Sequence, residues 1–373
     1  MPSARITNHS LKLKWSEGRI IRLDAEGRWG SFRDDENFYR RTMAGEVVLR
    51  QGRGYADCSS EQAEDLHQKI LHFLKKVGGA ADNPSFPITF YGEQGKHSIF
   101  MERVQQALQW TSERYAEEMT RFQNAYPETI EILPPDRYQD LVLLPALGCP
   151  NNQCTFCAFY QGQRFRVLNK EAFVEHITRV KALFGKALNG KKGLFLGAAS
   201  ALSMPQKKIL ECLQMVNDVF GKFPHGIAAF HDADHSPQRK PEDYDALADK
   251  GLGHVTIGLE TGDPELRKSF HKSADISHLL KVVRDQKSAG IRCAITVLIG
   301  VGAQKIEVHQ TATTQVVEAM QLDKNDLVYL SPLEGTSGAA DSDAEMELFR
   351  QSLSLVTAAQ ISPYLITKFR YFA

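Results

Sequence analysis

The cysteines are the side chains of this sequence whose type and spacing best suit chemistry. Three of the six lie within nine residues, at Cys149, Cys154 and Cys157. Thiols this close in a reducing compartment indicate a metal or a cluster rather than disulfide bonds. The sequence begins without the apolar stretch of a secretory signal, and no run of about 18 apolar residues predicts a membrane span. We therefore expect a cytoplasmic protein with reduced thiols and no membrane partner.

The three clustered cysteines follow a predicted apolar strand, Leu141–Leu147. In parallel α/β barrels, the loops that follow the strands build the active site. Thiolates bind iron–sulfur clusters, and a cubane cluster normally takes four of them. With three thiolates, one iron would lack a protein ligand. An open coordination position is what a catalytic cluster needs and what an electron carrier avoids.

Other interpretations of the three cysteines remain open. A structural zinc site usually takes four Cys or His ligands, and His176 could be the fourth, although it lies in the middle of a predicted helix. A ferredoxin-like carrier would need a fourth cysteine, and neither Cys212 nor Cys293 has suitable neighbours. Cysteines that are merely buried would not need to cluster in a loop, and Cys58, like Cys212 and Cys293, is isolated in the sequence. The alternative function is thus a non-catalytic iron–sulfur or zinc binding protein on a barrel scaffold.

The segment 148–160 resembles the cysteine motif of the radical S-adenosyl-L-methionine (SAM) superfamily. The usual motif has three residues between the first two cysteines, whereas this chain has four, in the pattern Gly-Cys-x4-Cys-Thr-Phe-Cys of one subgroup. The resemblance implies that Cys149, Cys154 and Cys157 hold a catalytic [4Fe–4S] cluster and that SAM is the second cofactor. It also implies reductive cleavage of SAM to a 5′-deoxyadenosyl radical, which abstracts hydrogen from an unidentified substrate.

The turn after the second predicted barrel strand, Gly193–Leu196, also fits this family. The resemblance places Gly197 and Ser200 beside the methionine part of SAM, where glycine permits close backbone approach. Family members usually carry an acidic residue just after this glycine, whereas this chain has Ala198 and Ala199. Backbone carbonyls are then the expected acceptors for the SAM amino group. The alternative is an ordinary turn between strand and helix.

Glu260 ends the fourth predicted strand within Gly-Leu-Glu-Thr-Gly, which matches the family pattern without a gap. A carboxylate at a strand end can accept hydrogen bonds from ribose hydroxyls. The resemblance therefore implies that Glu260 contacts the ribose of SAM. The alternative is an ion pair with a neighbouring base such as Arg292 or Lys272.

Three further residues receive roles from the resemblance. Ile299 and Gly300 end the fifth predicted strand, which resembles the adenine-contacting segment of the family and runs on to Gly302. Phe156, just before the last cysteine, would shield the cluster and lie against adenine. The segment Leu330–Thr336, after the sixth strand, also fits the family. For the fifth strand, the alternative is a barrel core without a ligand.

Two histidines and two aspartates gather in the segment Phe230–His235, after the third predicted strand. Such a group could form a second metal site or a proton relay. Polar residues in a solvent-facing loop are commoner, so we expect an ordinary loop, with substrate contact as the alternative.

The elements that must position these residues predict an α/β protein with two parts. Residues 1–135 are expected to form an extension with a small antiparallel meander, helices over Ser60–Lys76 and His97–Asn124, and a short strand at Ile88–Tyr91. Residues 136–373 alternate strands and helices and predict a partial, open, parallel (β/α)6 barrel. Its six predicted strands are Leu141–Leu147, Gly193–Leu196, Gly226–Phe230, His254–Leu259, Arg292–Ile299 and Leu327–Leu330.

Charge and composition bear on the partners. Lys plus Arg and Asp plus Glu both number 45, so the formal net charge is zero. Nucleic acid is therefore not indicated, and the basic residues of the N-terminal extension are interleaved with acidic ones. The expected partners are a reductant such as flavodoxin or ferredoxin and an unknown substrate.

Overall fold

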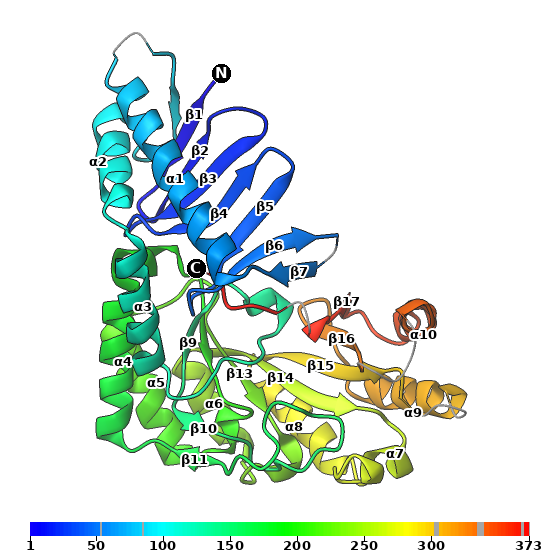
Figure 1. Ribbon diagram of the computed structural model, residues 1–373. Coiled ribbons are helices and arrows are strands. Elements are labelled where there is room, and N and C mark those ends of the chain that lie inside the picture. The colour runs from blue at the N-terminus through cyan, green and yellow to red at the C-terminus, as the bar shows by residue number, and fades with distance from the viewer. Residues whose placement is uncertain (53, 84–85, 302–305, 334–338, 367–368, 373) are drawn as a thin grey trace. The chain divides into compact units, whose positions relative to one another are not determined.

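The computed structural model describes residues 1–52, 54–83, 86–301, 306–333, 339–366 and 369–372 (Figure 1). The chain divides into two compact units. The first comprises residues 1–129, 176–191 and 370–373, and the second comprises residues 130–175 and 192–369. Among the described residues, no helix has both the length and the apolar character needed to cross a membrane.

The first unit contains an eight-stranded sheet in the order β7-β6-β5-β4-β3-β2-β1-β8. Neighbours are antiparallel except for β1 and β8, which are parallel. The expected antiparallel meander is thus present as β2 to β6, and β1, β7 and β8 extend it to a mixed sheet. The strands are β1 (Ser3–Ile6), β2 (Ser10–Lys14), β3 (Arg19–Asp24), β4 (Trp29–Asp34), β5 (Asn37–Arg41), β6 (Val47–Gln51), β7 (Gly54–Asp57) and β8 (Thr89–Tyr91).

Helices α1 (Ser60–Ala81) and α2 (His97–Leu108) cover one face of this sheet. A capping box begins α1, in which Ser59 Oγ accepts from Gln62 N and Gln62 Oε1 accepts from Ser59 N. The single helix expected over His97–Asn124 is wrong, because the chain breaks after α2 and restarts as α3 (Ser112–Ala125). Thr111 Oγ1 accepts from Arg114 N at 3.3 Å and so caps the new helix.

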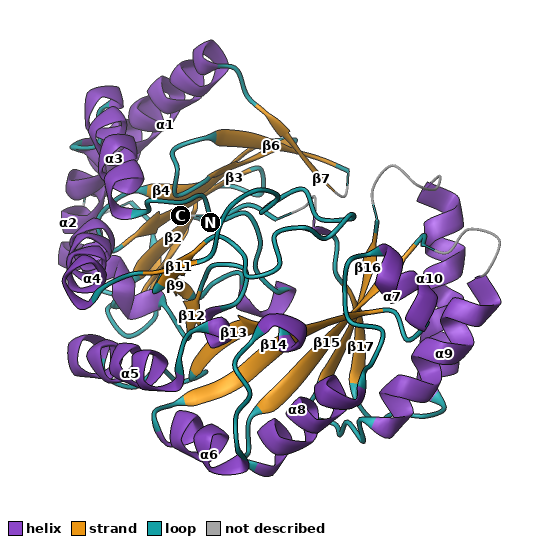
Figure 2. Ribbon diagram, turned by 90° about the horizontal axis from the view of Figure 1, so that it is seen from below, coloured by secondary structure: helices purple, strands orange, loops and turns teal. Residues whose placement is uncertain are grey.

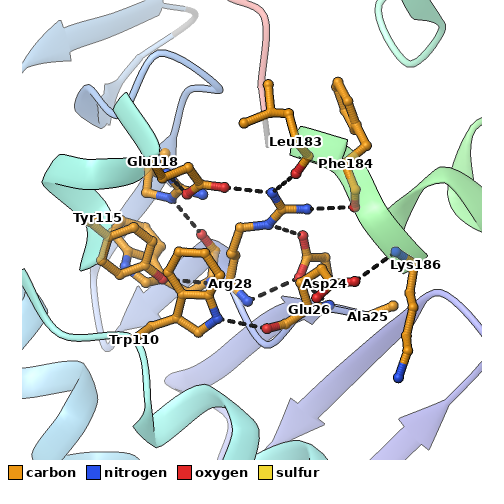
Figure 3. A network of polar contacts seen from close by, with 12 residues as sticks. Asp24, Ala25, Glu26, Arg28, Trp110, Tyr115, Glu118, Leu183, Phe184 and Lys186 are labelled. Carbon is orange, nitrogen blue, oxygen red and sulfur yellow. Dashed lines mark hydrogen bonds and ion pairs between the residues drawn. The ribbon is translucent and has the colours of Figure 1, made fainter. Parts of the chain in front are cut away.

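Arg28 is the buried centre of a polar network in the first unit (Figure 3). Its guanidinium donates to Asp24 Oδ2 at 2.6 Å and to Glu118 Oε1 at 2.5 Å. It also donates to the carbonyls of Leu183 and Phe184, at 2.8 and 3.1 Å. A single planar guanidinium thereby links three chain segments that lie far apart in sequence.

The second unit is built on a seven-stranded sheet in the order β17-β16-β15-β14-β13-β12-β9, in which every neighbouring pair is parallel. Figure 2 shows helices lying along the outer side of the curved sheet. The strands are β9 (Leu141–Leu143), β12 (Leu194–Leu196), β13 (Ile227–His231), β14 (Leu252–Glu260), β15 (Arg292–Ile299), β16 (Leu327–Pro332) and β17 (Gln360–Pro363). The helices of this unit are α5 (Gln206–Phe220), α6 (Pro241–Asp249), α7 (Pro264–Ser269), α8 (Ser277–Ser288), α9 (Ile306–Ala319) and α10 (Ala339–Ser354). A further helix, α4 (Lys170–Phe184), begins in this unit and belongs to the first unit from residue 176 on.

The predicted α/β class and the parallel sheet are confirmed, whereas the count of six barrel strands is not. The sheet has a seventh strand, β17, which pairs with β16 at the edge. This strand has four residues and ends in Pro363, a composition that does not predict a strand. Proline lacks the N–H that a central strand must donate, but an edge strand tolerates its absence.

Candidate functional site

The three clustered cysteines lie in a loop held between two short strands of the second unit. These strands, β10 (Ala146–Leu147) and β11 (Arg166–Val167), pair antiparallel. The predicted strand Leu141–Leu147 is therefore interrupted, and its end serves the loop instead of the main sheet. Gly148 begins the loop at φ +68°, and a Cβ there would lie 2.4 Å from the carbonyl oxygen of Arg164. Only glycine fits this backbone position.

Two neighbouring asparagines hold the sulfur atoms of the loop. Asn152 N donates to Cys149 Sγ at 3.3 Å, and Asn151 Nδ2 donates to Cys154 Sγ at 3.0 Å. Asn151 Nδ2 also donates to the His271 carbonyl at 2.9 Å, which ties the loop to the segment after α7. Hydrogen bonds from N–H to sulfur favour the charged thiolate. The role of Asn151 was not predicted from the sequence, because an asparagine between cysteines carries no signal of its own.

Burial acts against the charge on two of the thiols. It raises the pKa of Cys149 above its usual value and raises the pKa of Cys154 to about 12, although Lys272 partly offsets the rise at Cys154. Bound metal must therefore displace the proton from each thiol. Among the described residues, no three His, Cys, Asp or Glu side chains converge on one point that could hold a single metal ion. The donor set is three thiols, which are the ligands that iron–sulfur clusters use.

The turn after β12 lies against the cysteine loop, since Ala199 N donates to the Gly148 carbonyl at 3.4 Å. At Gly197, a Cβ would lie 2.6 Å from Leu144 Cδ2, so a larger residue would require this leucine side chain to move. Ala198 has φ +70°, a conformation that non-glycine residues rarely adopt. Ser200 is buried, and its Oγ accepts hydrogen bonds from Ser203 Oγ at 2.8 Å and from Asp232 N at 2.9 Å.

Glu260 ends β14 with φ +66°, where the pairing with β15 shifts register. Its Oε1 lies 3.7 Å from Lys272 Nζ, and Thr296 Oγ1 donates to its Oε2 at 3.5 Å. Burial raises the pKa of Glu260 despite the nearby Lys272. The ion pair considered from the sequence is thus present with Lys272. Arg292 begins β15 and so lies at the opposite end of these parallel strands.

The segment after β13 adds charged groups to the same strand ends. Asp234 Oδ2 accepts from the buried Arg267 at 2.7 Å, and Arg267 also donates to the Leu259 carbonyl at 2.6 Å. Asp232 Oδ2 lies 3.0 Å from His235 Nδ1. Burial raises the pKa of Asp232, but the hydrogen bond with His235 and the charge of Lys272 outweigh it and lower this pKa to about 2. The expected ordinary loop is therefore a partly buried ionic network.

His231, the first histidine of that segment, is buried rather than exposed. Its Nδ1 accepts from Gln286 Nε2 at 2.9 Å, and burial lowers its pKa to about 3. His176, the proposed fourth zinc ligand, belongs to the first unit and is bonded at Nδ1 to the Ala125 carbonyl at 2.7 Å.

Phe156 and the end of β15 share an apolar cluster. The ring of Phe156 meets that of Phe270 edge to face, with 5.2 Å between centroids, and both pack with Leu298. Ile299 is fully buried, and its carbonyl accepts from Leu333 N at 2.8 Å. Gly300 has φ +81°. Gly302 and residues 334–336 lie outside the described residues.

Residues 143–313 match the family described as the Radical SAM superfamily. This match confirms the family expected from the cysteine motif. The superfamily uses a [4Fe–4S] cluster and SAM, and the three thiols of the loop fit the cluster. No curated protein matches the chain.

Solved structures of radical SAM proteins resemble the chain at low identity. TsrM from Kitasatospora setae, a radical SAM methyltransferase, is 16% identical, with a TM-score of 0.41 over 58% of this chain and 40% of that one. Methylornithine synthase (PylB) is 17% identical, with a TM-score of 0.43 over 68% and 71%. A radical SAM methyltransferase from Sphaerobacter thermophilus is 16% identical, with a TM-score of 0.46 over 62% and 68%. The chain thus spans less than half the length of TsrM. Structural similarities with TM-scores this low do not indicate a substrate or a reaction for this chain.

Proposed function

This chain carries a radical SAM superfamily domain at residues 143–313, and from that premise we propose that the protein is a radical SAM enzyme. The observation that carries the proposal is the loop of three thiols beside the carboxyl ends of parallel strands. Loops at this edge of parallel α/β sheets form active sites. A cubane cluster with three protein thiolates has a corner left for SAM.

Cys149, Cys154 and Cys157 would hold the cluster, each binding one iron as a thiolate. When bound, the cluster would supply the electron for reductive cleavage of SAM to methionine and a 5′-deoxyadenosyl radical, which would abstract hydrogen from a substrate. The amides of Asn151 and Asn152 donate to two of the sulfurs and stabilise their negative charge. The protein's part is to hold the reactants in place and to exclude water.

Three strand ends would bind SAM. Glu260 would accept hydrogen bonds from the ribose hydroxyls, and Lys272 would hold its carboxylate in place. The backbone at Gly197 would receive the methionine part, with Ser200 fixing the turn through its bonds to Ser203 and Asp232. Two observations support these roles. The residues are joined to one another by hydrogen bonds and an ion pair, and they are buried at one edge of the sheet.

The adenine would lie against apolar surface. Ile299 ends β15, Gly300 follows it, and Phe156 packs with Phe270 in the apolar cluster that includes Leu298 of the same strand. An aromatic ring next to Cys157 also limits the access of water to the cluster. We further propose that a flavodoxin or ferredoxin in the cytoplasm supplies the electron.

Anaerobic reconstitution with iron and sulfide, followed by dithionite and SAM, tests the proposal. The wild-type protein should bind about four irons per chain and release 5′-deoxyadenosine. The variant C149A/C154A/C157A should do neither, whereas the matched variant C58S/C212A should do both. A tetrahedral zinc centre, or a cluster that yields no 5′-deoxyadenosine above the triple variant, would instead support the non-catalytic alternative.

A further inference from the structure

One face of the sheet in the first unit is free of helices α1 and α2. Alternate residues of each strand point to opposite faces of a sheet. The residues packed under α1 and α2 include Ala4, Leu11, Leu13, Ile21 and Leu23. Residues one position away in the same strands therefore occupy the opposite face.

The strand register places basic residues of that opposite face side by side. Arg5 of β1 pairs with Lys12 of β2, and Lys12 pairs with Arg22 of β3. The same line across the strands continues through Ser31 to Arg40 of β5. We call Arg5, Lys12, Arg22 and Arg40 the basic row. The side chains of Arg5, Lys12 and Arg22 are exposed.

The basic row does not stabilise the sheet. Directly opposed like charges on neighbouring strands, about 4.8 Å apart, are destabilising. Within the part of the chain that the structure describes, Arg5, Lys12 and Arg22 form no ion pair. The acidic Asp24, at the end of β3, is already bound to Arg28. Three adjacent cations without an acid to balance them indicate that the partner is an anion outside this chain.

Aromatic rings lie among the cations of this face. Tyr91 pairs with Arg5 at one end of the basic row and is 55% exposed. Arg33 lies over the ring of its cross-strand partner Phe38, at 5.5 Å. Near the other end of the row, the Arg40 guanidinium lies 3.4 Å from the centroid of Phe372. Such rings and guanidinium planes are surfaces on which nucleic-acid bases stack.

We propose that this face binds single-stranded nucleic acid, with the phosphates on the basic row and bases on the neighbouring rings. The inference concerns the first unit alone and does not depend on the proposed enzymatic function. An anionic membrane is the less suitable partner, because surface attachment needs exposed apolar side chains that insert. On β1, β2 and β3, Ile20 is the only apolar side chain of this face, and it is only partly exposed. Composition could not predict this face, because it counts the acids of the turns between the strands, such as Glu17 and Glu26, together with the bases of the strands.

Fluorescence anisotropy with the full chain and a labelled oligouridine of about 15 nucleotides tests the proposal. The triple variant R5Q/K12Q/R22Q should bind at least about tenfold more weakly at about 0.1 M salt. The slope of log affinity against log salt concentration should be less negative by about 2, because three phosphate contacts with a single strand are lost. The matched control K69Q/K75Q/K76Q removes three exposed lysines from α1, on the covered side, and should bind like wild type.

The melting temperature of R5Q/K12Q/R22Q should equal or exceed that of wild type, because like-charge repulsion is relieved. The proposal is overturned if wild type does not bind the oligouridine at low salt, or if both triple variants lose affinity equally. It is also overturned if phosphatidylserine vesicles, rather than the oligouridine, lose affinity when the basic row is neutralised.

Discussion

Glu260 Oε1 and Lys272 Nζ lie 3.7 Å apart, and their side chains are only 10% and 7% exposed. Burial raises the pKa of Glu260 even with the cation nearby. Burial lowers the pKa of Lys272, but the carboxylates of Glu260, Asp232 and Asp234 outweigh it, so this pKa is raised. The lysine thus balances several acids at once, and the charge on Glu260 depends on it.

Replacing Lys272 with Met should therefore destabilise the second unit. An unpartnered buried charge costs about 3–5 kcal/mol. Because the folded carboxyl has a raised pKa, it can escape this cost by taking up a proton. The loss measured by chemical denaturation should therefore be largest near pH 7.5 and smaller near pH 5.5.

The double variant E260Q/K272M serves as the control. It removes both charges of the pair, so it should recover part of the lost stability and should not show the relief at acid pH that K272M shows. A K272M variant within about 0.5 kcal/mol of wild type at both pH values would contradict the argument.

Gly148 offers a test of how the cysteine loop is held. In G148A, the new methyl would meet the Arg164 carbonyl oxygen at 2.4 Å in a left-handed backbone conformation. We expect a loss of at least about 2 kcal/mol and a reconstituted iron content below half that of wild type. The matched variant G162A has φ +74° with nothing within 4 Å, so strain alone should cost about 1 kcal/mol, with iron content retained. Equal iron loss in both variants would refute the role of the Gly148 contact.

The cluster motif was visible in the sequence because three ligands in one loop are necessarily close along the chain. The residues that support them were not visible. Asn151 contacts the carbonyl of His271, which lies 120 positions later. For Glu260, the sequence offered both Arg292 and Lys272 as partners, and only the fold shows that Lys272 is the one. Such partners follow from tertiary packing, for which single residues give no periodic signal.

The fold, too, could be predicted from the sequence only in part. Strand–helix alternation predicted the parallel sheet, because buried parallel strands are apolar throughout. The seventh strand, β17, was not predicted, because it is short and ends in Pro363. The basic row was not predicted either. Its members Arg5, Lys12 and Arg22 belong to separate strands, and only the strand register brings them side by side.

Substitution of Arg28 tests how much the polar network around it stabilises the first unit. R28M leaves the buried Glu118 with Arg41, 3.3 Å from its Oε2, as its remaining cation, and leaves the Leu183 and Phe184 carbonyls without their donor. Loss of one partner from a buried ion pair typically costs about 3–5 kcal/mol, and we expect a loss of that size in urea denaturation. The exposed Arg114, which lies 4.1 Å from the ring of Trp110, gives the control R114M, with an expected loss below about 1 kcal/mol. Similar losses in the two variants would show that the network is not important for stability.

His231 should make the second unit sensitive to acid. Burial holds its pKa at about 3, and its Nδ1 must stay unprotonated to accept from Gln286 Nε2. In the unfolded chain, the imidazole titrates near its usual value of about 6.5. As the pH falls from about 6.5 towards 3, the unfolded state binds a proton that the folded state does not, so stability decreases by up to about 1.4 kcal/mol per pH unit. In H231Q, urea denaturation between pH 6.5 and 5 should show a dependence shallower by about that amount.

The variant H235Q provides the opposite case. The hydrogen bond with Asp232 raises the pKa of His235, so its stabilising effect is present below about pH 6.5 and is lost as the pH rises through the folded value. H235Q should therefore change the pH dependence of stability above pH 6.5 and leave the acid side nearly as steep as in wild type. If H231Q and wild type had the same slope between pH 6.5 and 5, His231 would have to be protonated in the folded protein. The Gln286 hydrogen bond to Nδ1 would then not exist.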